Sequence, residues 1–152
     1  MRVRVTDQTF DPGAEITAFA GNRRDAGAMA NFVGYCRDES HGRKVSELYI
    51  EQYPGFTERE IARLAADVAG RCKVKDLLVI HRVGHIRPGE AIVLVAALSG
   101  HRNAAFEAVR LMMDYLKTDA PLWKKEIGPD GSRWIEAHAE DHVRRARAGE
   151  KI

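Results

Sequence analysis

Positively charged residues gather at the end of a helix that we predict over residues 101–117. Lys117 leaves this helix at the border between its polar and apolar faces, and Lys124 and Lys125 follow shortly after it. On the predicted strand that contains them, Lys124 and Glu126 share a face while Lys125 points away, because side chains alternate along a strand. Lys124 is therefore the better partner for Lys117, and Glu126 is placed to orient its ammonium group.

Ammonium groups arranged in this way suit a proton donor or a carbonyl activator near neutral pH. Lysines are also common on protein surfaces, where the stem packs and the charge stays in water. A solvated basic corner without chemistry is therefore the alternative interpretation of the cluster.

His101 and Arg102 occupy the first turn of the same helix. Unpaired backbone N–H groups and the positive end of the helix dipole already attract anions there, so two cationic side chains are electrostatically misplaced. We interpret the pair as recruited to bind a phosphate or a carboxylate. A solvated arginine beside a structural histidine is the alternative.

The two ends of the helix are too far apart to serve one small substrate within one chain. Sixteen residues separate His101 from Lys117, which is a rise of roughly 24 Å at about 1.5 Å per residue. A two-fold dimer could bring the first turn of one copy to the last turn of the other. The apolar residues of this helix also cover a wider arc than packing on one sheet face requires. Such an arc is typical either of a helix that contacts a second partner or of one unusually buried helix.

Other candidate ligands form no specific pattern. His138 and His142 are spaced to hold zinc on a predicted charged helix over residues 137–148, but no third ligand is evident. Cys36 and Cys72 lack the paired spacing of a zinc or redox site, so we expect plain thiols. We therefore predict no metal.

Bulk composition excludes several classes of protein. The 152 residues, 45% hydrophobic, fit a single domain, 1–152, with a real core. Lys and Arg total 24 against 22 Asp and Glu, so the net charge of +2 gives no global field for nucleic acid. The N-terminus does not read as a signal peptide and no apolar run could span a membrane, so we expect a cytoplasmic protein.

Hydrophobic periodicity predicts mixed helices and strands. The predicted strands lie at 2–6, 26–36, 45–51, 74–83, 90–98, 123–127 and 132–136, and the predicted helices at 12–20, from 57 to Gly70, 101–117 and 137–148. We expect the first strand near an edge, the second one buried, and 38–44 to be a loop. The hairpin-rich order favours an α+β fold. Neither GxGxxG nor GxxxxGK[ST] occurs, so the usual signatures of Rossmann and P-loop phosphate binding are missing.

Three local signals set predicted helix ends. Thr57 and Glu60 have the spacing of a capping box, and Gly70 is placed to end that helix in a left-handed cap. Ser99 is placed to cap the helix over 101–117.

Four separate blocks, in order along the chain, resemble the large subunit of molybdopterin synthase. They are EQYPGFTE (51–58), IHRVGHIRPGE (80–90), SGHRNAAFEA (99–108) and MDYLKTDAPLWKKE (113–126), and the similarity runs from about 27 to 137. The resemblance implies an α/β-hammerhead fold with an antiparallel sheet subdomain. It also implies a homodimer within a heterotetramer, with a small ubiquitin-like subunit at each end.

The same resemblance implies a reaction. The small subunit's Gly-Gly tail, carrying a terminal thiocarboxylate, donates sulfur to cyclic pyranopterin monophosphate and forms the dithiolene of molybdopterin. No metal or organic cofactor is required at this step.

Functional residues carry over by motif. Lys117 and Lys124 match the family's catalytic lysines, and His101 with Arg102 matches a pair that reaches the pocket from the neighbouring subunit. Phe32, Arg37, Met113 and Glu126 match residues placed to bind the substrate.

Two other functions compete with this interpretation. A non-catalytic adaptor could capture the glycine tail of a ubiquitin-like protein in the same groove, although the intact lysine pair argues against it. An RNA-binding protein would show affinity that falls steeply with salt, and the small net charge disfavours it.

Overall fold

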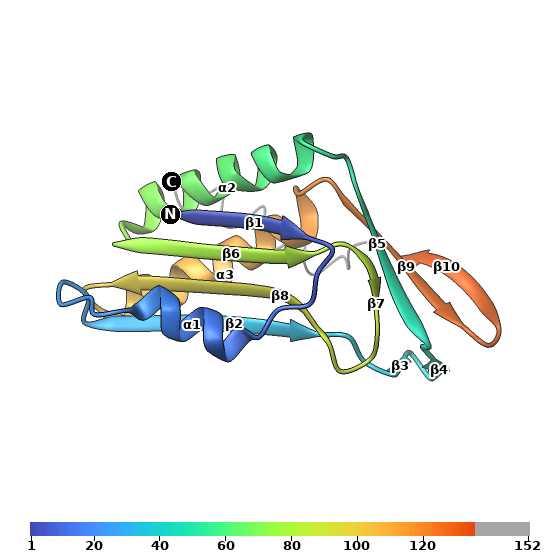
Figure 1. The fold of residues 1–152 in the computed structure, drawn as a ribbon. Helices are drawn as coiled ribbons and strands as arrows, with labels where there is room; N and C mark the ends of the chain where they lie inside the picture. The colour runs from blue at the N-terminus through green and yellow to red at the C-terminus, as the bar shows by residue number, and fades with distance from the viewer. Residues whose placement is uncertain (136–152) are drawn as a thin grey trace.

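The structure is a computed structural model that describes residues 1–135. The predicted helix over 137–148, with His138 and His142, lies outside the described residues. Within the described part of the chain, two sheets meet at one end of the molecule, and helices cover both faces of the larger sheet (Figure 1).

The larger sheet has four strands in the order β1-β6-β8-β2. The strands are β1 (Arg2–Thr6), β2 (Ala28–Tyr35), β6 (Asp76–Arg82) and β8 (Ala91–Ser99). β1 runs parallel to β6, and the other two pairings are antiparallel. The predicted pairing of the strands over 74–83 and 90–98 is confirmed, as is the edge position of the first strand.

Within residues 1–135, three helices pack against this sheet. They are α1 (Pro12–Ala20), α2 (Phe56–Cys72) and α3 (Arg102–Thr118). α2 and α3 pack together on one face, where side chains such as Leu77 of β6, Ile61 of α2 and Met112 of α3 are fully buried. α1 covers the opposite face through Phe19 (Figure 1). The apolar surface predicted for the helix over 101–117 therefore forms part of the main core.

The smaller sheet has the order β10-β9-β5-β7 and is antiparallel throughout. Its strands are β5 (Glu47–Gln52), β7 (Gly84–Ile86), β9 (Leu122–Gly128) and β10 (Gly131–Ile135), and β3 (Glu39–Ser40) pairs separately with β4 (Arg43–Lys44). A mixed sheet with helices beside an antiparallel sheet confirms the predicted α+β class.

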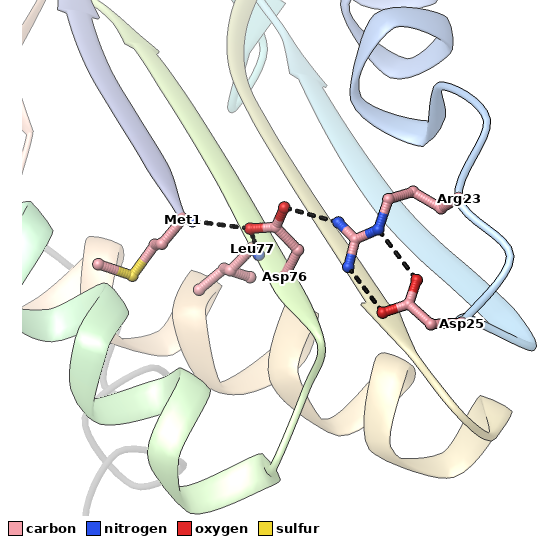
Figure 2. A network of polar contacts seen from close by, with 5 residues as sticks. All are labelled: Met1, Arg23, Asp25, Asp76 and Leu77. Atoms are coloured by element: carbon pink, nitrogen blue, oxygen red, sulfur yellow. Dashed lines mark hydrogen bonds and ion pairs between the residues drawn. The ribbon is translucent and has the colours of Figure 1, made fainter.

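An ion-pair network holds the start of β1 against β6 (Figure 2). The Asp76 carboxylate lies 2.8 Å from the Met1 amino group and 2.9 Å from Arg23, which also binds Asp25 at 3.0 Å. Burial alone would raise the pKa of Asp76, but hydrogen bonds from the terminal ammonium and the Leu77 N–H lower it below its usual value. The network therefore ties the segment between α1 and β2 to the start of β6.

The predicted capping box at Thr57 is wrong. α2 begins at Phe56 after Gly55, which has a positive φ of 80°, and Thr57 is fully buried. The Thr57 hydroxyl accepts from the Tyr53 N–H at 2.8 Å and donates to the Pro121 carbonyl at 3.0 Å. Thr57 thus uses its hydroxyl for a tertiary contact that fixes the chain just before β9.

Two other predicted caps are also wrong. α2 continues through Gly70 to Cys72, and Lys73 adopts the left-handed conformation in its place, with φ 54°. Ser99 lies at the end of β8, where its hydroxyl donates to the His101 carbonyl, and His101 itself is the N-cap residue of α3.

Two segments, 26–36 and 38–44, differ from their predictions in burial and in secondary structure. The strand predicted to be buried over 26–36 is the outer strand β2, and Phe32 on it is 42% exposed. The predicted loop over 38–44 contains a tight hairpin, because His41 and Gly42 both adopt positive φ. Small apolar residues in a strand therefore did not distinguish a central strand from an edge strand.

Alanine substitutions at two glycines test the position of Gly70 within α2 and the close contact of Gly27 with the Gly100 backbone. An added Cβ at Gly70 meets nothing within 4 Å, so Gly70→Ala should raise the free energy of unfolding by about 0.5–1 kcal/mol. At Gly27 the added Cβ would lie 2.3 Å from the Gly100 carbonyl oxygen, so Gly27→Ala should destabilise the protein. Urea titrations at one protein concentration measure both changes. A Gly70→Ala protein less stable than its parent would contradict the helical position of Gly70.

Candidate active site

Four of the predicted site residues line one cleft at the junction of the two sheets. Arg37 follows β2, Lys117 comes from the last turn of α3, and Lys124 and Glu126 come from β9. The cleft has a volume of about 420 Å³. Residues separated by up to 89 positions in the chain thus share one cavity, and three of these four predicted residues, Arg37, Lys117 and Lys124, are cationic.

The alternation of β9 determines which lysine faces the cleft. Lys125 lies on the opposite face of the strand, with its ammonium 5.5 Å from the centre of the Tyr49 ring and 5.2 Å from that of Trp134. Lys124 and Glu126 line the cleft. The sequence-based choice of Lys124 over Lys125 is therefore confirmed as a matter of position.

Glu126 forms an ion pair with an arginine that the sequence analysis did not select. The Arg133 Nη2 and Nε atoms donate to one oxygen of Glu126 at 3.0 and 3.2 Å. Arg133 also lines the cleft, and it lies directly opposite Glu126 in the pairing of β9 with β10. The strands predicted over 123–127 and 132–136 had no register assigned to them. In the structure Gly128 pairs with Gly131, and that register places 133 opposite 126.

Cys36 is a buried thiol in the cleft wall. Burial, followed by the negative charges of Glu90 and Glu126, raises its pKa above the usual value. Its sulfur lies 3.7 Å from the Arg37 carbonyl oxygen and 3.8 Å from that of Ile86. The thiol is therefore protonated near neutral pH, which makes it a poor nucleophile.

His81 is a buried histidine for which the sequence gave no specific role. Burial, followed by the positive charge of Lys124, lowers its pKa to about 3, and Lys117 acts in the same direction. Its Nδ1 lies 2.8 Å from the Arg82 carbonyl oxygen, which fits a neutral ring that donates from Nδ1. His81 thus adds no further positive charge beside the two lysines.

Phe32 and Met113 line a second, more apolar hollow of about 380 Å³. Lys117 borders both cavities, so the hollow adjoins the cationic cleft. Phe106 on the same hollow is 64% exposed. The predicted contact of α3 with a second partner stays a prediction, but the exposed aromatic rings lie where such a contact would form.

His101 and Arg102 are exposed at the opposite end of α3 from Lys117. Neither residue lines the cleft. Within one chain the structure does not bring them to the lysines, as the length of the helix predicted.

Residues 1–135 contain neither a cluster of metal ligands nor a helix that could cross a membrane. No group of three or more His, Cys, Asp or Glu side chains is arranged to hold a metal ion. No helix in that part of the chain has both the length and the apolar composition to span a bilayer.

The sequence profile of the family described as MoaE protein matches residues 5–119. The chain belongs to the MoaE family. Curated relatives agree with this assignment. The molybdopterin synthase catalytic subunit of Caulobacter vibrioides is 48% identical over 143 residues, which cover 94% of this MoaE chain and 94% of the relative. That of Mesorhizobium japonicum is 52% identical over 141 residues, which cover 91% and 87%.

Solved structures extend the similarity to the fold. The molybdopterin biosynthesis MoaE protein from Burkholderia ambifaria aligns with a TM-score of 0.80 and 41% identity, over 97% of each chain. The fold of residues 1–135 in this MoaE chain is therefore that of its family.

The burial of His81 predicts a pH dependence of stability. The pKa of His81 in the folded protein, about 3, lies below the ordinary value of 6.5. At pH values between these two, His81 binds a proton in the unfolded chain but not in the folded chain. This contribution to stability is present above about pH 6.5 and is lost as the pH falls toward 3. Urea midpoints at about pH 7.5 and about pH 5 should therefore differ less for His81→Gln than for the parent. An equal loss in both proteins would show that His81 is not responsible.

Proposed function

We propose that this chain, acting as one domain over residues 1–152, is the catalytic subunit of molybdopterin synthase. It transfers sulfur from the C-terminal thiocarboxylate of a small ubiquitin-like subunit to cyclic pyranopterin monophosphate. The observation that carries the proposal is the meeting of Arg37, Lys117 and Lys124 in one cleft of a MoaE family chain.

The charges of the cleft suit both substrates. A thiocarboxylate is already anionic and nucleophilic at neutral pH, so the enzyme needs no base to generate the attacking sulfur. The pterin substrate is also anionic because it carries a cyclic phosphate. Arg37, Lys117 and Lys124 in this partly enclosed cleft provide the attraction and orientation that such a reaction requires.

Each cation has a proposed role. Lys117 holds the acyl carbonyl of the tail or protonates a leaving oxygen, and Lys124 assists it. Arg37 binds the cyclic phosphate, for which a guanidinium offers paired donors. The Cys36 thiol takes no part, because its raised pKa keeps it protonated.

A second copy of the chain completes the site in this proposal. His101 and Arg102 of the neighbouring copy reach the cleft and bind the phosphate together with Arg37. The support is geometric, because these exposed residues lie a full helix length from Lys117 in their own chain. The exposed Phe32 and Phe106 rings provide apolar surface for the contact between copies.

We place the reaction in the cytosol. Cys36 and Cys72 are both free thiols, which fits a reducing compartment.

Replacing Lys117 should abolish sulfur transfer without unfolding the protein. Lys117 is exposed, so Lys117→Ala removes a charge from the cleft and little packing. With thiocarboxylated small subunit and the cyclic pterin, dithiolene formation should fall by about 100-fold or more. Lys125→Ala is the matched control, because Lys125 lies on the other face of β9 and should retain normal turnover.

The same assay separates an enzyme from an adaptor. Normal turnover by a folded Lys117→Ala protein would refute the catalytic role of this lysine. Tight binding of the small subunit's tail by the parent protein without any product would favour the non-catalytic adaptor.

Mixed dimers test whether two copies share a site. A Lys117→Ala chain and an Arg102→Ala chain should each be nearly inactive alone. Hybrid dimers of the two contain one intact composite site, so mixing should restore up to about half the activity per hybrid dimer. The hybrids are quantified by native mass spectrometry, and a lack of activity in confirmed hybrids would contradict the shared site.

A further inference from the structure

A carboxylate lies among the cations of the proposed active site. Glu126 lines the cleft with Lys117 and Lys124, and it is only 11% exposed. The ion pair with Arg133 occupies one of its oxygens. A charged carboxylate in this position must be paired, because an uncompensated charge away from water is costly.

Without Arg133, Glu126 would compete with the substrate. Glu126 shares the cleft-facing side of β9 with Lys124, and Lys117 lines the same cavity. An anion that enters the cleft would then have to displace an internal carboxylate from its ammonium partner. The free energy of that exchange would be lost from substrate binding.

We propose that Arg133 is a positioning residue that keeps the Glu126 carboxylate from competing with the anionic substrates for the cleft lysines. The inference depends on the proposed function, since it assumes that the cleft binds anionic substrates. Arg133 acts through Glu126 and not by contact with the reacting atoms.

The geometry of the hairpin supports this role. β9 and β10 pair so that Arg133 lies directly across from Glu126, and two nitrogen atoms of the guanidinium converge on a single carboxylate oxygen. Arg133 is 39% exposed, so its end of the pair is solvated while the carboxylate end is covered. A planar guanidinium holds a carboxylate in a fixed orientation better than a flexible ammonium does.

A double-mutant cycle tests the proposal in the full-length protein. The parent, Arg133→Ala, Glu126→Gln and the double variant are compared by KM and kcat for sulfur transfer. They are also compared by calorimetric affinity for a short synthetic peptide that ends in Gly-Gly with a free carboxylate. We expect Arg133→Ala to raise KM for the pterin and weaken peptide binding about 10- to 100-fold. In the Glu126→Gln background the same substitution should change either quantity by less than about threefold.

Two further variants sharpen the comparison. Arg133→Lys keeps the charge and should retain most of the peptide affinity. Arg63→Ala removes a similar arginine–glutamate pair, Arg63 with Glu60 at 3.1 Å on α2, which does not line the cleft. It should leave KM and peptide affinity unchanged.

Equal losses from Arg133→Ala in both backgrounds would overturn the inference, because Arg133 would then contact the ligand itself or only brace the hairpin. A lowered melting temperature without any change in KM or peptide affinity would overturn it as well.

The two readouts also separate this inference from the proposed function. Coupled peptide binding in a parent protein that transfers no sulfur would support the inference and refute the function. Sulfur transfer by the parent protein, together with independent effects of Arg133→Ala and Glu126→Gln, would support the function and refute the inference. A parent protein that shows neither sulfur transfer nor peptide binding would refute both.

Discussion

Repulsion between like charges is the constraint on which the rest of this structure depends. Arg37, Lys117 and Lys124 share one partly enclosed cleft, where their mutual repulsion is screened less than in bulk water. The fold places each of these cations: Arg37 follows β2, Lys117 lies in the last turn of α3, and Lys124 lies on β9. The buried contacts between α3 and the larger sheet, and the bond from Thr57 to the Pro121 carbonyl, hold these elements together. Packing in the core thus stabilises an arrangement that repulsion between the three cations opposes.

The groups around the cleft are in protonation and pairing states that fit this concentration of charge. His81 is neutral because burial and the neighbouring lysines lower its pKa, so it adds no further repulsion. Cys36 keeps its proton, so no thiolate offers an internal counter-ion. Glu126 is a negative group in the cleft wall, and Arg133 binds it. The surroundings of the cleft therefore preserve a positive site for two anionic substrates.

Much of the fold and part of the site could be predicted from residue patterns alone. Period-two alternation separated Lys124 from Lys125, and helical spacing identified the apolar surface of α3, because both signals reflect local geometry. The predicted caps of α2 were wrong because tertiary contacts determine the structure there. The Thr57 hydroxyl bonds to a carbonyl 64 residues away, and α2 passes through Gly70 because packing outweighs its weak helix propensity. The ion pair of Glu126 was missed because the register of the β9–β10 hairpin was not followed to residue 133.

The central claim is that the cleft at the junction of the two sheets receives the partner's tail beside Lys117. A crystal structure of this chain bound to its small ubiquitin-like subunit tests that claim most directly. The account predicts the terminal glycine carboxylate of the tail within about 3.2 Å of the Lys117 Nζ atom, and the first turn of the neighbouring copy's α3 at the same cleft. A tail bound elsewhere, or a cleft that no neighbouring copy approaches, would contradict the account.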